Sequence, residues 1–259
     1  MKKIISFIIK AEKGFLKKPD INEGIYLTYN MLHKPAILGI LGAIIGLEGY
    51  QKNGKLPEYY NKLIKIPIGV KPVGDEKGNF QKTQITYNNT TGMASNEAGG
   101  NLIITEQTLI KPSYKIYLLL DMEDENENKL YSNIKGQKAE YLPYLGKNDY
   151  SLWWDKEDVE EYHMWELFVK GSNFRISTVF KKDEAIVNYL ARAITRRAIG
   201  GRKNDFNYFE RLPIGFNKEL FQYEYSDFAY SNALLEEEIK IESANLYTLK
   251  NENEVIYLY

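Results

Sequence analysis

The stretch at residues 29–47, YNMLHKPAILGILGAIIGL, constrains the fold more than any other part of the chain. It predicts a loop that enters a helix at Lys34-Pro35, because proline suits the first helical turn, where a missing N–H loses no partner. The helix is almost wholly apolar and carries three glycines at helical spacing, Gly39, Gly42 and Gly46. Each glycine costs a helix about 1 kcal/mol relative to alanine. We therefore expect the helix backbone to approach a neighbour closely: strand backbone beneath it, an anion at its N-terminal N–H groups, or both.

The composition excludes several classes of site. The chain has 259 residues, enough for one large domain or two small ones. It contains no cysteine, which rules out disulfides and thiolate metal sites and fits a reducing compartment. The two histidines, His33 and His163, would need carboxylates to complete a zinc site. The apolar run at 37–47 is much shorter than the roughly 20 residues that span a bilayer. We expect a cytoplasmic protein with no membrane segment, metal or cofactor.

Charge is unevenly distributed in a chain whose formal net charge is −1. Residues 1–18 hold six lysines and one glutamate, and residues 170–211 hold ten basic and four acidic residues. Residues 121–166 hold thirteen acidic residues and five lysines. Blocks of this kind indicate faces with different partners. The two basic blocks are candidates for tracking phosphates, although a solvated protein face has the same pattern.

Hydrophobic periodicity predicts an α+β fold with a mainly antiparallel sheet. Residues 2–9 are expected to form a central strand, and further strands are expected at 65–73, 101–110, 113–121, 165–169, 238–243 and 255–259. The pattern also predicts a second helix at 182–199, a short helix at 59–63 and an acidic turn at 123–128. The polar segment 75–100 has no sustained apolar period, which is typical of a long loop or projecting hairpin. Helices on one face of this sheet make a ferredoxin-like arrangement the simplest version.

Two stretches resemble a known family. Residues 7–50, FIIKAEKGFLKKPDINEGIYLTYNMLHKPAILGILGAIIGLEGY, resemble the first-helix region of the CRISPR-associated RAMP superfamily, and more narrowly the type I-B branch of the Cas-five family of Cascade subunits. Residues 140–151, EYLPYLGKNDYS, resemble the Leu-Gly-Lys segment that follows the long hairpin in that family. The similarity covers the first half of the chain well, and residues 170–259 match only loosely. Its specificity comes from the length and order of these runs, since no single motif is a catalytic fingerprint.

The resemblance implies a non-catalytic RNA-binding subunit of a type I-B CRISPR Cascade effector complex. Such subunits cap the 5′ handle of the guide RNA (crRNA), contact the backbone and large subunits, and serve antiviral interference, in which base pairing reads the target DNA. The implied architecture is a single ferredoxin-like (RRM-like) RAMP domain over residues 1–259, the palm. A projecting thumb hairpin is expected at about 75–110, and C-terminal strands are expected to form an extension at about 212–259.

Single-stranded RNA recognition needs phosphate contacts and flat surfaces on which splayed bases stack. The RNA-contact candidates are Lys13, Lys17, Lys18, Tyr29, Asn30, His33, Lys34, Lys82, Gln84, Tyr87, Met93, Lys147, Arg192, Arg196, Arg197 and Arg202. Each kind of candidate also has a plainer interpretation. His33 can be a histidine satisfied by local backbone, the basic residues can be solvated or docked on another subunit, and the Leu-Gly-Lys segment can simply pack.

Two other classes of function stay open. A metal-independent endoribonuclease that processes precursor crRNA needs a general base and acid near the 2′-hydroxyl, and His33 with Tyr29 and Lys34 is the candidate set. The acidic runs at 121–124 and 155–161 contain the residue types of a two-metal nuclease, but charged runs in turns are usually solvated. A protein–protein scaffold without a direct RNA role is the other class.

Overall fold

The computed structural model describes most of the chain. The described residues are 1–20, 24–52, 54–75, 77–88, 102–168, 173–182, 186, 189–190, 206–235, 245–250 and 254–259. The strand expected at 238–243 lies outside them. Of the helix expected at 182–199, residues 186, 189 and 190 are described as helical.

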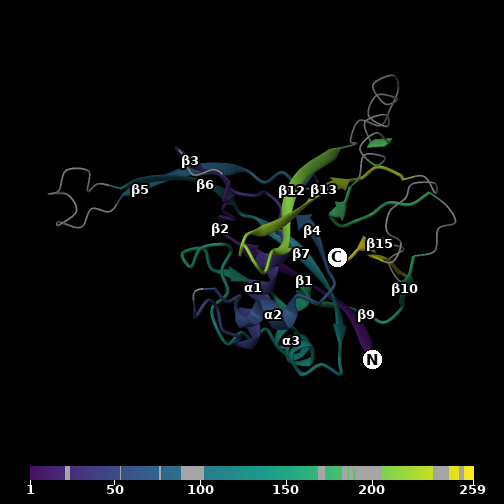
Figure 1. Cartoon of the computed structure of the whole chain (residues 1–259). Helices are drawn as coiled ribbons and strands as arrows, with labels where there is room; N and C mark the ends of the chain where they lie inside the picture. The colour runs from purple at the N-terminus through teal and green to yellow at the C-terminus, as the bar shows by residue number, and fades with distance from the viewer. Residues whose placement is uncertain are drawn as a thin grey trace, which may run out of the picture.

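The body of the protein is a βαββαβ unit of the ferredoxin-like type (Figure 1). Its main strands are β1 (Lys2–Ala11), β4 (Ile68–Val73), β7 (Ser113–Asp121) and β9 (Glu160–Tyr162). Strand β7 lies between β4 and β1, while β9 and the short β8 (Leu152–Trp153) pair with the other edge of β1. All of these pairings are antiparallel. The predicted α+β class with a mainly antiparallel sheet is therefore confirmed.

Strand β1 lies inside the sheet because both of its faces are apolar. Ile5, Phe7 and Ile9 belong to the cluster that holds the helices. Ile4 belongs to a second cluster on the opposite face, together with Ile256 near the end of the chain. The central strand expected at 2–9 is confirmed, and the sheet is covered on both sides.

Helix α1 (Lys34–Ile45) begins where the sequence predicts, with His33 as its N-cap, and ends before Gly46, which is in the left-handed conformation. Gly39 and Gly42 approach helix α2 (Glu58–Leu63) and Gly46 approaches Glu140, so none of the three lies against strand backbone, which was one of the two neighbours that the sequence suggested. A Cβ on Gly42 would lie 2.4 Å from the Cβ of Tyr59, in α2. Any side chain at residue 42 would push α2 away from α1. The short helix expected at 59–63 is confirmed.

A third helix, α3 (Glu125–Gly136), replaces the acidic turn that was expected at its start. The carboxylate of Asp124 caps it by accepting the N–H groups of Asn126 and Glu127, at 2.9 and 3.1 Å. Only Leu130 and Ile134 are buried, so the apolar period is too weak to reveal the helix in the sequence. Helix α3 is the second helix of the ferredoxin-like unit. None of the described helices is both long and apolar enough to cross a membrane.

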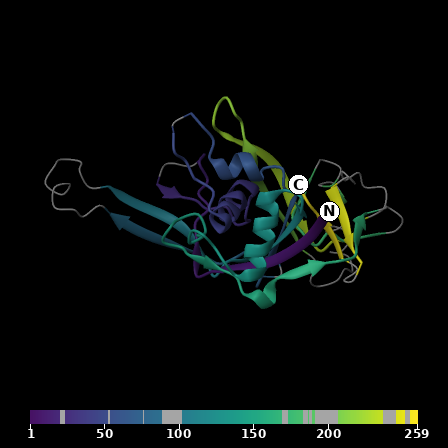
Figure 2. The same cartoon turned by 90° about the horizontal axis from the view of Figure 1, so that it is seen from below.

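The predicted thumb is a two-stranded hairpin of β5 (Lys82–Asn88) and β6 (Ile103–Ile110), inserted between β4 and β7. Strands β2 (Lys13–Gly14) and β3 (Ile25–Tyr26) pair with β6 and fasten the hairpin to the body. Figures 1 and 2 show β5 and β6 running outward from the body, on the side away from both termini.

Two further sheets follow the ferredoxin-like unit. One consists of β10 (Trp165–Leu167), β14 (Leu246–Leu249) and β15 (Glu254–Tyr257), in that order, and packs against the sheet face opposite the helices. The other consists of β11 (Phe180–Lys181), β13 (Tyr223–Ser231) and β12 (Asn207–Phe216), and β12 contacts α1. Strands expected at 165–169 and 255–259 are present, and β13 with the end of β12 falls in the range 212–259 where C-terminal strands were expected, although hydrophobic periodicity did not predict the bounds of either strand.

Gly146 makes a close backbone contact that a side chain would prevent. It adopts φ 84°, and a Cβ there would lie 1.8 Å from the carbonyl oxygen of Phe15. We expect Gly146→Ala to lower the free energy of unfolding by at least about 2 kcal/mol, because a strained backbone site costs of order 1–3 kcal/mol and the neighbour must also move. Urea denaturation followed by circular dichroism measures this change.

The matched control is Gly49→Ala, since a Cβ at the exposed Gly49 meets open space. It should change the free energy of unfolding by less than about 0.5 kcal/mol. Equal effects of the two substitutions would contradict the proposed role of the Gly146 contact.

Candidate nucleic-acid interface

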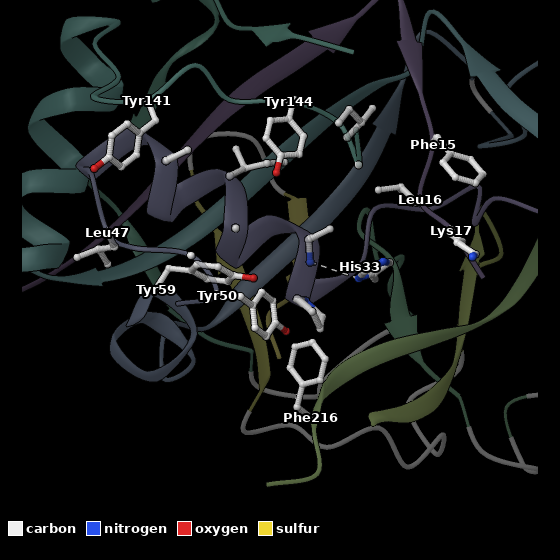
Figure 3. Close-up of a pocket in the computed structure, with 18 of the residues that line it drawn as sticks. Phe15, Leu16, Lys17, His33, Leu47, Tyr50, Tyr59, Tyr141, Tyr144 and Phe216 are labelled. Carbon is white, nitrogen blue, oxygen red and sulfur yellow. Dashed lines mark hydrogen bonds between the residues drawn. The ribbon is translucent and has the colours of Figure 1, made fainter. Parts of the chain in front are cut away.

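A cleft of about 420 Å³ opens along α1 (Figure 3). Residues of α1 between Pro35 and Ala43 line it, and its other walls come from segments that are far apart in the sequence. These segments are residues 15–17, the loop 47–50 after α1, Tyr59 of α2, the loop 141–146, and the ends of β12 and β13 that meet at their turn. The cleft is thus a product of the tertiary fold and not of one local motif.

Aromatic side chains dominate the lining of this cleft. They are Phe15, Tyr50, Tyr59, Tyr141, Tyr144, Phe216 and Tyr223. Tyr50, Tyr141 and Tyr144 are 62%, 55% and 47% exposed, so a ligand can reach them. The rings of Phe216 and Tyr223 stack on each other, with centroids 4.7 Å apart. Nucleobases stack on aromatic surfaces of this kind.

His33 lines the same cleft and is also the N-cap of α1. Its Nδ1 accepts the N–H of Ala36 at 3.3 Å, which assigns the ring proton to Nε2. The rings of Tyr29 and Tyr223 meet the imidazole edge to face, at centroid distances of 5.2 and 5.8 Å. Burial lowers the pKa of His33 to about 3, so the ring is neutral at pH 7. The ring offers Nε2–H as a hydrogen-bond donor without a positive charge. Its Nδ1 already accepts the Ala36 N–H, which is one of the N–H groups that an anion at the helix N-terminus would bind.

Lys34, the next residue, does not line the cleft. Its Nζ donates to the main-chain oxygen of Tyr259 at 2.7 Å. Burial lowers the pKa of Lys34 to about 8, and the nearby Lys181 acts in the same direction. The sequence placed His33 and Lys34 in one contact, but the structure gives them different surroundings.

Asn30 and Tyr29 hold the loop before α1 in place. Asn30 is 1% exposed, its side-chain nitrogen donates to the Gly78 carbonyl, and its side-chain oxygen accepts the Phe80 N–H at 3.1 Å. Tyr29 is 3% exposed. The Glu210 carboxylate accepts the main-chain N–H groups of Asn30 at 3.2 Å and of Met31 at 2.9 Å. These two candidates therefore have structural roles, and no sequence pattern pointed to Glu210.

The predicted lysines divide into exposed and paired groups. Lys13 and Lys17 are exposed; Lys17 borders the cleft, and its ammonium lies 3.9 Å from the ring centroid of Tyr26. Lys18 pairs with Glu210 at 3.2 Å. Lys82, at the start of β5, is exposed, and partial burial of its ammonium lowers its pKa, although Glu210 acts in the opposite direction and Lys18 in the same one. Lys18, Lys82 and Glu210 therefore meet at the base of the hairpin.

The Leu-Gly-Lys segment packs against the base of the hairpin. The carbonyl of Leu145 accepts the N–H of Phe15 at 3.1 Å. The Lys147 ammonium pairs with the buried carboxylate of Glu106 on β6 at 2.9 Å, and the Tyr150 hydroxyl donates to the same carboxylate at 3.1 Å. Lys147 thus takes part in a structural ion pair, and an RNA contact by this segment stays a prediction.

The other candidates lie on the hairpin or outside the described residues. Gln84 and Tyr87 are exposed on β5, and the Tyr87 ring centroid lies 4.7 Å from the Lys147 ammonium. Met93, Arg192, Arg196, Arg197 and Arg202 lie outside the described residues, so their RNA contacts stay predictions.

The acidic runs form ion pairs and a helix cap. Asp155 and Asp158 both pair with Lys10, at 2.9 and 2.5 Å, and Glu161 pairs with Lys3 at 2.7 Å. Within the described part of the chain, no group of three or more histidine or acidic side chains is placed to hold a metal ion.

The buried His33 makes stability depend on pH in a defined window. The unfolded chain binds a proton at His33 with a pKa of about 6.5, whereas in the folded protein burial lowers this pKa to about 3. The unfolded state therefore binds more protons between these values, and stability falls as the pH falls from about 6.5 towards 3. We expect His33→Asn, which keeps a capping side chain, to flatten this dependence by up to about 1.4 kcal/mol per pH unit.

Urea denaturation at a series of pH values measures this difference. His163→Asn is the control, since the His163 side chain is 75% exposed, and it should keep the slope of the unmodified protein. Identical slopes for the unmodified protein and His33→Asn would contradict the burial argument.

No protein-family model and no curated protein matches this sequence. Among solved structures, a chain in a cryo-EM structure of the type III-B Cmr-beta complex bound to cognate target RNA and AMPPnP has a TM-score of 0.50 and 11% identity, over 99% of both chains. A chain of a CRISPR RNA-guided surveillance complex has a TM-score of 0.49 and 8% identity, over 88% of this chain and 90% of that one. A CRISPR protein from Archaeoglobus fulgidus has a TM-score of 0.45 and 12% identity, over 98% and 97%. At these identities the likeness concerns the fold alone, and this chain shares its fold with the chain of the type III-B Cmr-beta structure.

Proposed function

We propose that this protein is a non-catalytic RNA-binding subunit of a CRISPR effector complex, of the type I-B Cascade kind, that holds the 5′ handle of the guide RNA. The observation that carries the proposal is the aromatic cleft, whose exposed rings open beside the exposed Lys17. Rings for bases and cations for phosphates are the two requirements of single-strand binding. In this proposal the backbone and large subunits of the complex are the protein partners.

The electrostatics of this region fit a strand that passes the cleft from outside. Among the residues that line the cleft, Lys17 is the one with a cationic side chain. Lys13 lies four residues earlier, on β2. Both are exposed, and neither forms an ion pair within the described residues. Their charges are therefore available to phosphates.

The hairpin extends the surface that an RNA or a neighbouring subunit can meet. Its seven-residue strand β5 spans roughly 20 Å at the usual rise per residue. Three apolar or aromatic residues of the hairpin region are exposed: Tyr87 on β5 at 41%, Ile103 on β6 at 67%, and Leu102 just before β6 at 56%. Exposed apolar side chains on a projecting element are typical of a binding surface.

The surroundings of His33 weigh against catalysis. A general base works best with a pKa near the operating pH, but burial lowers the pKa of His33 to about 3, and its Nδ1 is used by Ala36. Burial also raises the pKa of the Tyr29 hydroxyl well above its usual value. These features support a binding subunit over a metal-independent ribonuclease.

Charge reversal at the exposed lysines tests the binding surface. We expect the double variant Lys13→Glu, Lys17→Glu to bind a labelled 5′-handle RNA at least about tenfold more weakly, because two phosphate contacts become repulsive. Native gels in the presence of a chelator measure the affinity, and denaturing gels of the same samples detect cleavage of the repeat RNA.

The matched control reverses two exposed lysines elsewhere, Lys65→Glu with Lys156→Glu, and so changes the net charge equally. It should bind within about twofold of the unmodified protein. If the protein cleaves the repeat RNA in the presence of a chelator, and His33→Asn abolishes this cleavage, the protein belongs to the ribonuclease class. No binding and no cleavage would favour a scaffold that meets RNA only in the assembled complex.

The salt dependence of binding gives a second, independent test. The logarithm of the affinity for single-stranded RNA falls with the logarithm of the salt concentration by about 0.7 for each neutralised phosphate. We expect the slope to become shallower by about 1.4 in the Lys13, Lys17 double variant and to stay unchanged in the Lys65, Lys156 variant. Fluorescence anisotropy over a salt series measures both slopes, and an affinity that is flat in salt would contradict an electrostatic track.

A further inference from the structure

The aromatic cleft contains a histidine N–H whose hydrogen bond is not made within the described residues. Nδ1 of His33 accepts the Ala36 N–H, so the ring proton is on Nε2. Within the described part of the chain, Nε2 donates to no protein acceptor, although His33 is 96% buried and lines the cleft. The Nε2–H is therefore open to a hydrogen bond with a ligand in the cleft, and a ligand that supplies an acceptor there gains this bond.

We propose that the cleft holds one unstacked nucleobase of the bound RNA, with tyrosine rings against its faces and the Nε2–H of His33 donating to an acceptor atom on its edge. The inference rests on the proposed RNA-binding function and assigns its base contact. His33 becomes a base-reading residue in this proposal, which selects one of the two contacts, phosphate or base, that the sequence allowed.

The geometry of the cleft suits a flat ligand. In the view of Figure 3, the ring of Tyr144 lies above α1, the ring of Phe216 lies below it, and His33 lies beside the start of the helix. The Tyr50 and Tyr144 rings are 62% and 47% exposed and come from different loops, so they offer separate stacking surfaces. Every nucleobase presents a π-face to such rings, and every nucleobase carries an acceptor on its edge.

The charge distribution favours a base inside the cleft and the phosphates outside it. His33 is neutral, and among the residues that line the cleft Lys17 is the one lysine or arginine. A phosphate inside the cleft would meet tyrosine rings and aliphatic side chains, with too few cations to replace its hydration. The same phosphate beside Lys13 and Lys17 stays in solvent, so the backbone remains outside while a base turns in.

An abasic scan of the handle RNA tests the proposal. A set of labelled 5′-handle RNAs, each lacking one base, is titrated with the unmodified protein and with Tyr144→Leu, Tyr50→Leu and His33→Asn. We expect one position at which base removal weakens binding by about tenfold, the effect of losing one stacked base. At that position the cost should fall to about twofold or less in each cleft variant, because the base and the side chain act on each other.

The controls separate this base contact from a general loss of structure. Trp153→Leu changes an exposed aromatic residue, 41% exposed on β8, outside the cleft lining, and His163→Asn changes the other histidine. Both should keep the tenfold cost at the same position. Tyr50 and Tyr144 are exposed, so their variants report on the cleft even if His33→Asn destabilises the start of α1.

The failures of this inference and of the proposed function are distinguishable. Tight binding of the intact RNA with no position coupled to the cleft variants would overturn the base contact and leave the RNA-binding function in place. Cleft variants that bind RNA normally but lose a partner subunit would show that a protein side chain occupies the cleft, which also overturns it. Absence of binding to any handle RNA would instead remove the function on which the inference rests.

Discussion

The arrangement of the candidate site depends on one carboxylate, that of Glu210. Its side chain is 7% exposed and accepts two main-chain N–H groups of the loop before α1 as well as the ammonium of Lys18. A carboxylate with so little solvent is stable only with such partners. Because Glu210 belongs to β12, these bonds tie the β12–β13 hairpin to the start of α1. The same hairpin carries Phe216 and Tyr223, so the tie determines where one wall of the cleft stands relative to His33.

A second set of contacts positions the opposite wall. The backbone of residue 146 lies against Phe15, and the Lys147–Glu106 ion pair joins the same loop to β6. The loop 141–146, which carries Tyr141 and Tyr144, is therefore held at the base of the projecting hairpin. The same contacts hold the cleft wall and the hairpin, so a displacement of β6 would also move the loop 141–146. This connection gives the Leu-Gly-Lys segment a structural role: Leu145 is buried and Lys147 is paired, while Tyr141 and Tyr144 stay exposed at the cleft.

Local features of the structure were predictable from the sequence, and contacts between distant segments were not. Pro35 and Gly46 mark the ends of α1, the apolar run at 2–9 marks a central strand, and the polar segment after residue 75 marks the projecting hairpin. Helix α3 was missed because only Leu130 and Ile134 face the core, so its charged sequence resembles a turn.

The site was harder to predict than the fold for the same reason. Its aromatic walls come from segments that share no motif: Tyr50, Tyr141 and Tyr144 lie within the resembling stretches, whereas Tyr59 and Tyr223 lie outside them. Asn30 and Lys147 have the residue types of RNA contacts, but both are bonded inside the protein. The partners that decide this, Gly78 for Asn30 and Glu106 for Lys147, are separated from them by more than 40 residues. Residue type and local spacing carry no information on such pairings.

The separation between neutral cleft and exposed lysines has a consequence for recognition. Phosphate contacts attract and position a nucleic acid at long range, whereas contacts with base edges distinguish one sequence or register from another. A charged histidine in the cleft would serve both purposes at once and would bind any phosphate that reached it. Nδ1 of His33 caps the helix and burial keeps the ring neutral, so Nε2–H is the one hydrogen-bond donor left on the ring. If the proposed RNA binding holds, affinity resides in Lys13 and Lys17 and register in the cleft, so separate substitutions alter the two properties.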